Sequence, residues 1–241
     1  MYSAKNRSFF FIAFLFFAVH LNAQPVFPEE ASPEESGFES IFDGKTLEGW
    51  DGDSTYWRVE NGCIVGEVTP ENLLERNSFL IWREGTVNDF ELKLEYRVSA
   101  EGNSGINYRS FEVPGLRWAL KGYQCDIDGQ GQWSGQNYEE RGRTFLALRG
   151  QVTRLSENQK PEIIGSPGDK EELLQHINDD WNECHIIAQG NVLIHMINGH
   201  VMSMVTDQDK MKRTKDGLLG VQVHVGPPMT IEYRNIRLKK L

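Results

Sequence analysis

Short stretches in which polar and apolar residues alternate constrain this fold more than any other feature of the sequence. Residues 106–109, 123–128 and 221–225 each carry a large polar group at every second position, with apolar residues between, and the apolar stretch 145–148 leads into Arg149. Side chains alternate between the two faces of a β-strand, so the polar groups of each stretch fall on one side. If these strands are neighbours, that side is one shared polar face, although any half-exposed antiparallel sheet shows a similar alternation.

The polar residues of these stretches hydrogen-bond in fixed geometries. Amides, guanidinium groups, carboxylates and an imidazole suit a ligand covered in hydroxyl groups, whereas ordinary solvated faces are rich in Lys, Glu, Thr and Ser. We therefore expect a ligand site on this face. Its candidate residues are Asn107, Arg109, Gln124, Asp126, Asp128, Arg149, Gln222 and His224, with Glu67 at the end of another strand that could reach the site.

The rest of the sequence predicts strand after strand. Apolar residues recur with period two in 89–98, and the Asn-Gly pairs at 61–62 and 198–199 fit tight turns between strands. About a dozen strands without βαβ alternation indicate an all-β, two-layer antiparallel sandwich. The hydrophilic connection 150–180 contains Ser166-Pro167 followed by acidic residues, which predicts one short helix over 167–176, capped by Ser166.

The N-terminus has the features of a secretory signal. Lys5 and Arg7 precede the apolar run 9–19, and Ala23 offers a small residue for cleavage. A run of this length is too short for a bilayer, which needs about 20 residues. We therefore expect a signal peptide over 1–23, a periplasmic or secreted location and no membrane span after cleavage. Residues 24–37, rich in proline and glutamate, are predicted to be a flexible leader before one domain over 38–241.

The charge of the chain narrows its possible partners, and the cysteines are a separate structural question. Loss of residues 1–23 would move the formal net charge from −10 to −12, which disfavours nucleic acid and anionic membranes. Cys63, Cys125 and Cys184 have no metal-like spacing and lie in predicted strands, so we expect buried thiols, with one disulfide as the alternative.

Several motifs together resemble the 3-keto-disaccharide hydrolase family. They occur in the family's order from about residue 38 to the end and are specific as a set. They are Phe42-Asp43-Gly44-Lys45-Thr46-Leu47 with Gly49-Trp50, Trp57-Arg58-Val59, Asp89-Phe90-Glu91-Leu92, Gly102-Asn103-Ser104-Gly105-Ile106, Gly122-Tyr123-Gln124, Ile197-Asn198-Gly199, Tyr233-Arg234-Asn235-Ile236 and, from one subgroup, 222–229. The resemblance implies a jelly-roll sandwich like that of concanavalin-type lectins and glucanases, exported by bacteria and acting on glycosides with a ketone at C3.

One position departs from the family's pattern. Gln124 stands where the family is expected to have a glutamate, and an amide cannot titrate. Either this position binds substrate without exchanging protons, or this chain has lost activity.

A ketone at C3 determines which catalytic groups are needed. The ketone acidifies the C2 proton, so a base can remove it, the glycosidic oxygen can leave from C1, and water can add back. His224 can act as the base, Arg109 can stabilise the enolate, and Asp126 can orient the histidine or act as an acid or base. A structural role for His224, and a plain ion pair between Arg109 and Asp126, remain alternatives.

Aromatic side chains at the rim of the polar face would stack on sugar rings. Trp118 and Trp133 are the candidates, because they lie in the loops that flank 123–128. Core packing is the alternative for each, and it fits Trp133 less well because its surroundings are polar and rich in glycine.

Three other functions fit the same residues. Asp126, Asp128 and His224 could hold a divalent cation that replaces Arg109 as the electrophile. A conventional glycosidase would need two carboxylates across the scissile bond, for which Asp126, Asp128 and Glu67 are candidates. A carbohydrate-binding module without turnover would need only the groove.

Overall fold

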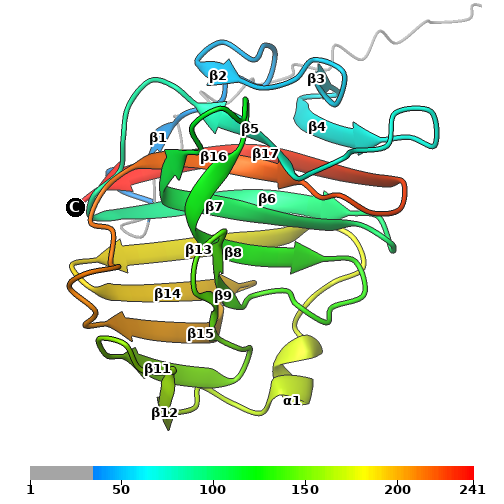
Figure 1. The fold of residues 1–241 in the computed structure, drawn as a ribbon. Coiled ribbons are helices and arrows are strands. Elements are labelled where there is room, and N and C mark those ends of the chain that lie inside the picture. The colour runs from blue at the N-terminus through cyan, green and yellow to red at the C-terminus, as the bar shows by residue number, and fades with distance from the viewer. Residues whose placement is uncertain (1–34) are drawn as a thin grey trace, which may run out of the picture. The chain divides into compact units, whose positions relative to one another are not determined.

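Two β-sheets stacked face to face form the fold of this computed structural model (Figure 1). The structure describes residues 35–241, so the predicted signal peptide and most of the predicted leader lie outside the described residues. The larger sheet, sheet A, has ten strands in the order β12-β11-β15-β14-β13-β6-β17-β4-β3, with β1 paired to β17. The smaller, sheet B, has seven strands in the order β10-β9-β8-β7-β16-β5-β2.

The strands of sheet A are β1 (Glu39–Ser40), β3 (Trp57–Glu60), β4 (Cys63–Val68), β6 (Phe90–Val98), β11 (Gln151–Leu155), β12 (Glu162–Gly165), β13 (Asn182–Gln189), β14 (Val192–Ile197), β15 (His200–Asp207) and β17 (Met229–Lys240). Those of sheet B are β2 (Trp50–Asp51), β5 (Ser78–Trp82), β7 (Asn103–Glu112), β8 (Leu120–Asp128), β9 (Asn137–Glu140), β10 (Thr144–Ala147) and β16 (Leu218–Val223). The pairs are antiparallel except β11 with β15, which is parallel.

The alternation in the sequence explains how the sheets stack. The apolar residues of β7, β8 and β16 form the core with sheet A, and Ile106, Cys125 and Val221 are each at most 2% exposed. Their polar neighbours therefore fall on the opposite, outer face of sheet B. The predicted two-layer sandwich is confirmed, and all three cysteines are buried and free.

The connection 150–180 is more ordered than its composition suggests. It contains β11 and β12, which the sequence analysis missed, and one helix, α1 (Lys170–Leu174). The predicted helix was too long, and its predicted cap was wrong. Asp169 is the N-cap, because its side chain accepts hydrogen bonds from the backbone N–H groups of Glu171 and Glu172. None of the described helices is long and apolar enough to cross a membrane.

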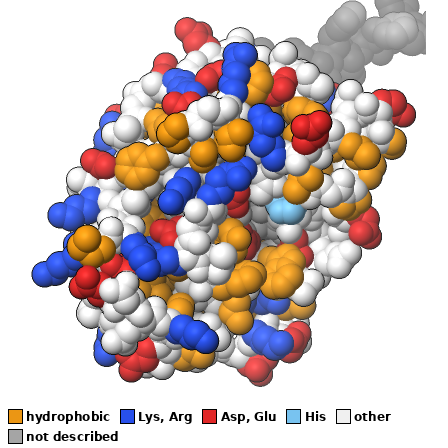
Figure 2. Space-filling model, in the orientation of Figure 1, with side chains coloured by type: hydrophobic (Ala, Val, Ile, Leu, Met, Phe, Trp, Pro, Cys, Tyr) orange, Lys and Arg blue, Asp and Glu red, His pale blue; other side chains and the backbone are white. Residues whose placement is uncertain are grey.

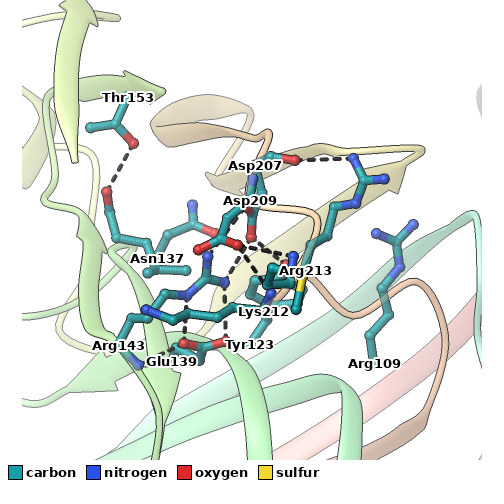
Figure 3. Close-up of polar contacts among 12 residues, drawn as sticks. Arg109, Tyr123, Asn137, Glu139, Arg143, Thr153, Asp207, Asp209, Lys212 and Arg213 are labelled. Carbon is teal, nitrogen blue, oxygen red and sulfur yellow. Dashed lines mark hydrogen bonds and ion pairs between the residues drawn. The ribbon is translucent and has the colours of Figure 1, made fainter. Parts of the chain in front are cut away.

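A buried ionic network ties sheet B to sheet A behind β9. Arg143 donates hydrogen bonds to Glu139 on β9 and to Asp207 at the end of β15, both at 2.7 Å, and Tyr123 donates to Asp207 at 2.6 Å (Figure 3). Each carboxylate thus has charge-assisted partners in a desolvated place. The inner face of β9 is fixed, while its alternate residues remain on the outer face.

Candidate active site

Three of the four stretches predicted to share a polar face are adjacent strands. β7 pairs with both β8 and β16, and Asn107 lies directly opposite Gln124. The fourth stretch, on β10, is separated from β8 by β9, which places Tyr138 opposite Gln124. Because directly opposed residues share a face, Tyr138 and Glu140 join the polar row on the outer face of sheet B.

A cavity of about 490 Å³, here called the outer-face pocket, lies on this side of sheet B. Its lining residues are Asn77, Asn103, Gln124, Asp126, Trp133, Tyr138, Glu140, Arg141, Phe145 and His224. Figure 2 shows this face of the molecule hollowed, with a histidine and several hydrophobic side chains bordering the hollow. The pocket gathers four of the predicted site residues: Gln124, Asp126, Trp133 and His224.

A chain of buried amides orients the Asp126 carboxyl group. Gln124 Nε2 donates to Asp126 Oδ1 at 2.7 Å, and Gln222 Nε2 donates to Gln124 Oε1 at 3.1 Å. Gly105 makes this chain possible, since a Cβ there would overlap the Gln124 carboxamide. Gln124 thus positions the Asp126 carboxyl group. The sequence suggested instead that this amide either binds substrate or marks a loss of activity.

Burial makes Asp126 a carboxyl group that holds its proton at neutral pH. Desolvation raises its pKa to about 8, the neighbouring Glu140 and Asp128 add to the rise, and the hydrogen bonds from Gln124 and Gln136 oppose it. A neutral carboxyl group with a pKa near the working pH can donate a proton and take one back. Burial also raises the pKa of Glu140, which Arg141 and Asn77 partly offset.

His224 is arranged as a neutral base. Its Nδ1 lies 2.6 Å from the carbonyl oxygen of Val225, which fixes the tautomer because only a protonated Nδ1 can donate to that oxygen. Nε2 then carries the free lone pair. Burial lowers the pKa of His224, although the bond to Val225 opposes the shift, so the ring stays unprotonated at neutral pH.

Polar groups from separate segments close the pocket around these two residues. Asn77 accepts a hydrogen bond from the backbone N–H of Val225 at 2.9 Å and has its amide 3.4 Å from Glu140 Oε1. It thereby connects the histidine segment to β9. Arg141 Nε lies 3.6 Å from the same Glu140 oxygen, and its guanidinium group is the cation that lines the pocket.

Three aromatic rings form one wall of the pocket. Trp133 stacks on Phe145 with ring centroids 5.6 Å apart, and Tyr138 meets Phe145 edge-on at 5.2 Å. Phe145 is 43% exposed, so the wall faces solvent and is not part of the core. An apolar wall beside a few placed polar groups is the usual composition of a small-molecule site.

The sequence of this chain matches a known protein family over almost all of the described residues. The sequence profile of the family described as "3-keto-alpha-glucoside-1,2-lyase-like domain" matches residues 37–239. The chain belongs to this family. A 3-keto-disaccharide hydrolase of Bacteroides thetaiotaomicron is 39% identical over 87 residues, a match that spans 33% of this chain and 30% of that protein.

Solved structures show the same fold at low sequence identity. A Parabacteroides distasonis protein provisionally classed as a glycosyl hydrolase has a TM-score of 0.59 at 22% identity, over 88% of this chain and 98% of that one. The carbohydrate-binding module CBM66 of Bacillus subtilis has a TM-score of 0.51 at 14% identity, over 80% and 96%. At these identities the likeness shows that this family member shares its sandwich fold with both proteins.

The predicted catalytic role of Arg109 is wrong. Arg109 is fully buried and lies apart from the pocket-lining residues, with its guanidinium group hydrogen-bonded to Asn88 O, Gly190 O and Asp89 Oδ1 at 2.7–2.9 Å. A register shift between Tyr108 and Phe111 and a φ of 45° at Arg109 break the alternation that predicted an outward side chain. Arg109 therefore joins β7 to the β13–β14 turn.

Two further predicted ligands hold loops instead of substrate. The Asp128 carboxylate accepts the backbone N–H groups of Gln132, Trp133 and Ser134, each at 2.8 Å, and so fixes the loop that presents Trp133. Arg149 donates to Ser134 O and Lys170 O at 3.0 Å. Neither side chain lines the outer-face pocket.

Four other predicted substrate ligands lie outside the pocket. Glu67 is on sheet A, 2.7 Å from Arg58. Asn107 and Gln222 are on the predicted face but are fully buried, so they can act only from beneath the site. Trp118 lines a separate cavity, and its indole N–H donates to Asp51 at 2.9 Å.

The predicted cation site does not form. Within residues 35–241, no group of three or more His, Cys, Asp or Glu side chains could hold a metal ion. Asp126 and His224 do share the pocket, but the Asp128 oxygens are already occupied by the 132–134 backbone.

Sequence reasoning also missed part of this family member's site. Glu140, Tyr138 and Arg141 belong to β9 and its turn, a segment with no apolar alternation to identify it as a strand. Residues 137–140 are Asn-Tyr-Glu-Glu, so the sequence carries no signal that Asn137 and Glu139 face inward while Tyr138 and Glu140 face the pocket.

Proposed function

We propose that this protein cleaves the glycosidic bond of 3-keto-glycosides, including 3-keto-disaccharides, by removing the proton at C2. One observation carries the proposal: the His224 imidazole and the Asp126 carboxyl group line the same pocket. The family's description as 1,2-lyase-like supports elimination across C1 and C2, and the partial match to a 3-keto-disaccharide hydrolase supports the substrate class.

His224 acts as the base in this proposal. Nε2 takes the C2 proton, the electron pair of the C–H bond forms an enolate on the C3 oxygen, and the enolate collapses to a C1–C2 double bond as the C1–oxygen bond breaks. Water then adds at C1, and C2 regains a proton. The fixed Nδ1 bond to Val225 keeps the Nε2 lone pair available before substrate arrives.

Asp126 acts as the acid for the departing oxygen, since burial keeps it protonated near neutral pH. Arg141 takes the role that the sequence suggested for Arg109, because it is the cation that lines the outer-face pocket and can stabilise the enolate oxygen. Trp133 and Phe145 provide the stacking wall for a sugar ring.

One rival function has support of its own. Asp126 and Glu140 are two carboxyl groups in one pocket, as a conventional glycosidase requires, although Glu140 takes the place of Asp128 and Glu67, which the sequence suggested as the second carboxylate. Equal cleavage of unmodified disaccharides and their 3-keto forms would favour this rival. Binding without any cleavage would favour a carbohydrate-binding module.

The proposal predicts a bell-shaped pH dependence of kcat/KM for release of 4-nitrophenol from its 3-keto-glucoside. The rate should fall on the acid side below pH 6.5, where His224 gains a proton, because burial lowers its pKa. It should fall on the alkaline side near pH 8, where Asp126 loses its proton.

The His224→Gln variant should lose the acid limb and about 10²- to 10⁴-fold in rate, the range typical of a general base. His185, a half-buried histidine on sheet A, supplies the matched control as His185→Gln. A His224 variant with more than a tenth of the wild-type rate would remove the histidine from the mechanism.

We further infer that the protein is exported to the periplasm or beyond, from the basic start, the apolar run and the small residue at Ala23. Protein recovered from the native host should begin at Gln24 when its N-terminus is sequenced. Recovery of the chain with residues 1–23 intact from the cytoplasm would contradict export.

A further inference from the structure

A second cavity of about 470 Å³, here called the Trp118 cavity, adjoins the outer-face pocket. The two meet at three consecutive residues: Asn77 lines the outer-face pocket, while Arg76 and Ser78 line the Trp118 cavity. The linings of the two cavities therefore meet along residues 76–78, just before and at the start of β5. The function proposed above makes no use of the second cavity.

Trp118 is fixed in a costly conformation within this cavity. Its φ of 53° lies in the left-handed region, which is rare for a bulky side chain and costs about 1–3 kcal/mol. Phe79 N–H holds the strained backbone by donating to Trp118 O at 3.0 Å. The ring itself is held by its hydrogen bond to Asp51, which Arg83 in turn fixes at 2.8 Å.

The other lining groups are those that bind sugars. Tyr56 adds a second aromatic side chain, and the Arg117 guanidinium group stacks on the Trp118 ring at 3.9 Å. Among residues 35–241, Arg76 and Glu75 have no hydrogen-bond or ion-pair partner, and both line the cavity. Planar charged groups of both signs beside aromatic rings suit a neutral, hydroxyl-rich ligand better than an ion of either charge.

We propose that the Trp118 cavity is a saccharide-binding subsite, which holds a neutral sugar unit of a chain whose reacting unit occupies the outer-face pocket. The two units are assigned to one molecule because the linings of the two cavities meet at the consecutive residues 76–78. The proposal rests on the proposed function only for the identity of the reacting unit. Binding at the Trp118 cavity itself needs no ketone and no turnover.

The test is a titration of the ¹⁵N-labelled protein with maltopentaose, cellopentaose and laminaripentaose, followed by NMR. The chain has six tryptophans, so the Trp118 indole signal is assigned from a Trp118→Phe variant. At least one pentasaccharide should shift the Trp118 indole signal together with the backbone signals of 75–78. Shifts confined to the Trp133 indole, or no shift with any of the three, would overturn the proposal.

Two variants and a control separate a subsite from general surface contact. Trp118→Ala and Arg76→Ala should each weaken binding of the responding pentasaccharide at least tenfold. Arg76 is exposed and has no partner among the described residues, so its loss does not threaten folding if the tryptophan variant is unstable. The control is Arg154→Ala, which changes a partly exposed arginine on β11 of sheet A and should bind as the wild type does. Unchanged binding by Arg76→Ala would count against the subsite.

The outcome is independent of the catalytic test. The probes are unoxidised saccharides, so binding at Trp118 can be present whether or not the 3-keto-glucoside is cleaved. Loss of cleavage in the His224 and Asp126 variants, in turn, leaves the Trp118 cavity intact.

Discussion

The Asp126→Asn variant should lose about 10²- to 10⁴-fold in kcat/KM towards a 3-keto-glucoside at pH 7, because an amide cannot give the leaving oxygen a proton. The substitution is nearly isosteric, and the new amide oxygen still accepts the bond from Gln124. Aglycone release is the readout. Glu67→Gln is the matched control, since Glu67 lies on sheet A and should be dispensable. Retention of more than a tenth of the activity would exclude Asp126 as the acid.

The same variant should be more stable than the wild type in mild alkali. The folded-state pKa of Asp126 is raised to about 8 from an ordinary 3.8, so the wild type loses stability progressively as pH rises from about 4 to about 8. Each pKa unit is worth about 1.4 kcal/mol, which makes the gain at pH 8 a few kcal/mol. Urea unfolding at pH 4 and pH 8 should show a gain for Asp126→Asn only at the higher pH.

The Arg109→Leu variant should be less stable than the wild type but should keep its catalytic rate. Removing the buried guanidinium group breaks three hydrogen bonds and costs about 3 kcal/mol in total, because Asp89 is 36% exposed and the acceptors can regain water. For a domain of this size, that lowers Tm by roughly 10 °C.

Arg58→Leu is the control for Arg109→Leu, because its exposed ion pairs with Glu60 and Glu67 are worth less than about 1 kcal/mol. The folded fraction of Arg109→Leu should keep the wild-type kcat and pH profile. A loss of rate at unchanged Tm would restore Arg109 to the active site.

The fold could be predicted because strand alternation is a local property. Ile106 and Cys125 turn inward and Asn107 and Gln124 turn outward wherever the strand is regular, and the register confirms their pairing. The prediction failed where the strand is irregular. Arg109 follows the sequence pattern, but a bulge and a positive φ turn it away, and neither leaves a clear mark in the sequence.

The candidate site was only half predictable for a related reason. Asp126 and Gln124 lie on β8 and His224 directly follows β16, and both stretches have obvious periodicity. The other pocket residues Glu140, Tyr138 and Asn77 come from short segments whose position depends on tertiary contacts. Asp128, in contrast, was predicted to line the site and does not. It has the side-chain type and the spacing of a ligand, but a turn of backbone N–H groups folds onto it and occupies its oxygens.

The ionic network behind β9 has a consequence for how substrate is selected. Arg143 holds Glu139 and Asp207 on the side of β9 that faces sheet A. The strand is therefore fixed on its inner side, and Tyr138 and Glu140 on its outer side are held in place with it. This surface of β9 is ordered before a ligand binds, so binding costs little free energy for ordering the strand. Under the proposed function, discrimination between epimers should then depend on steric fit against a rigid surface, so that a sugar with one inverted hydroxyl group binds more weakly.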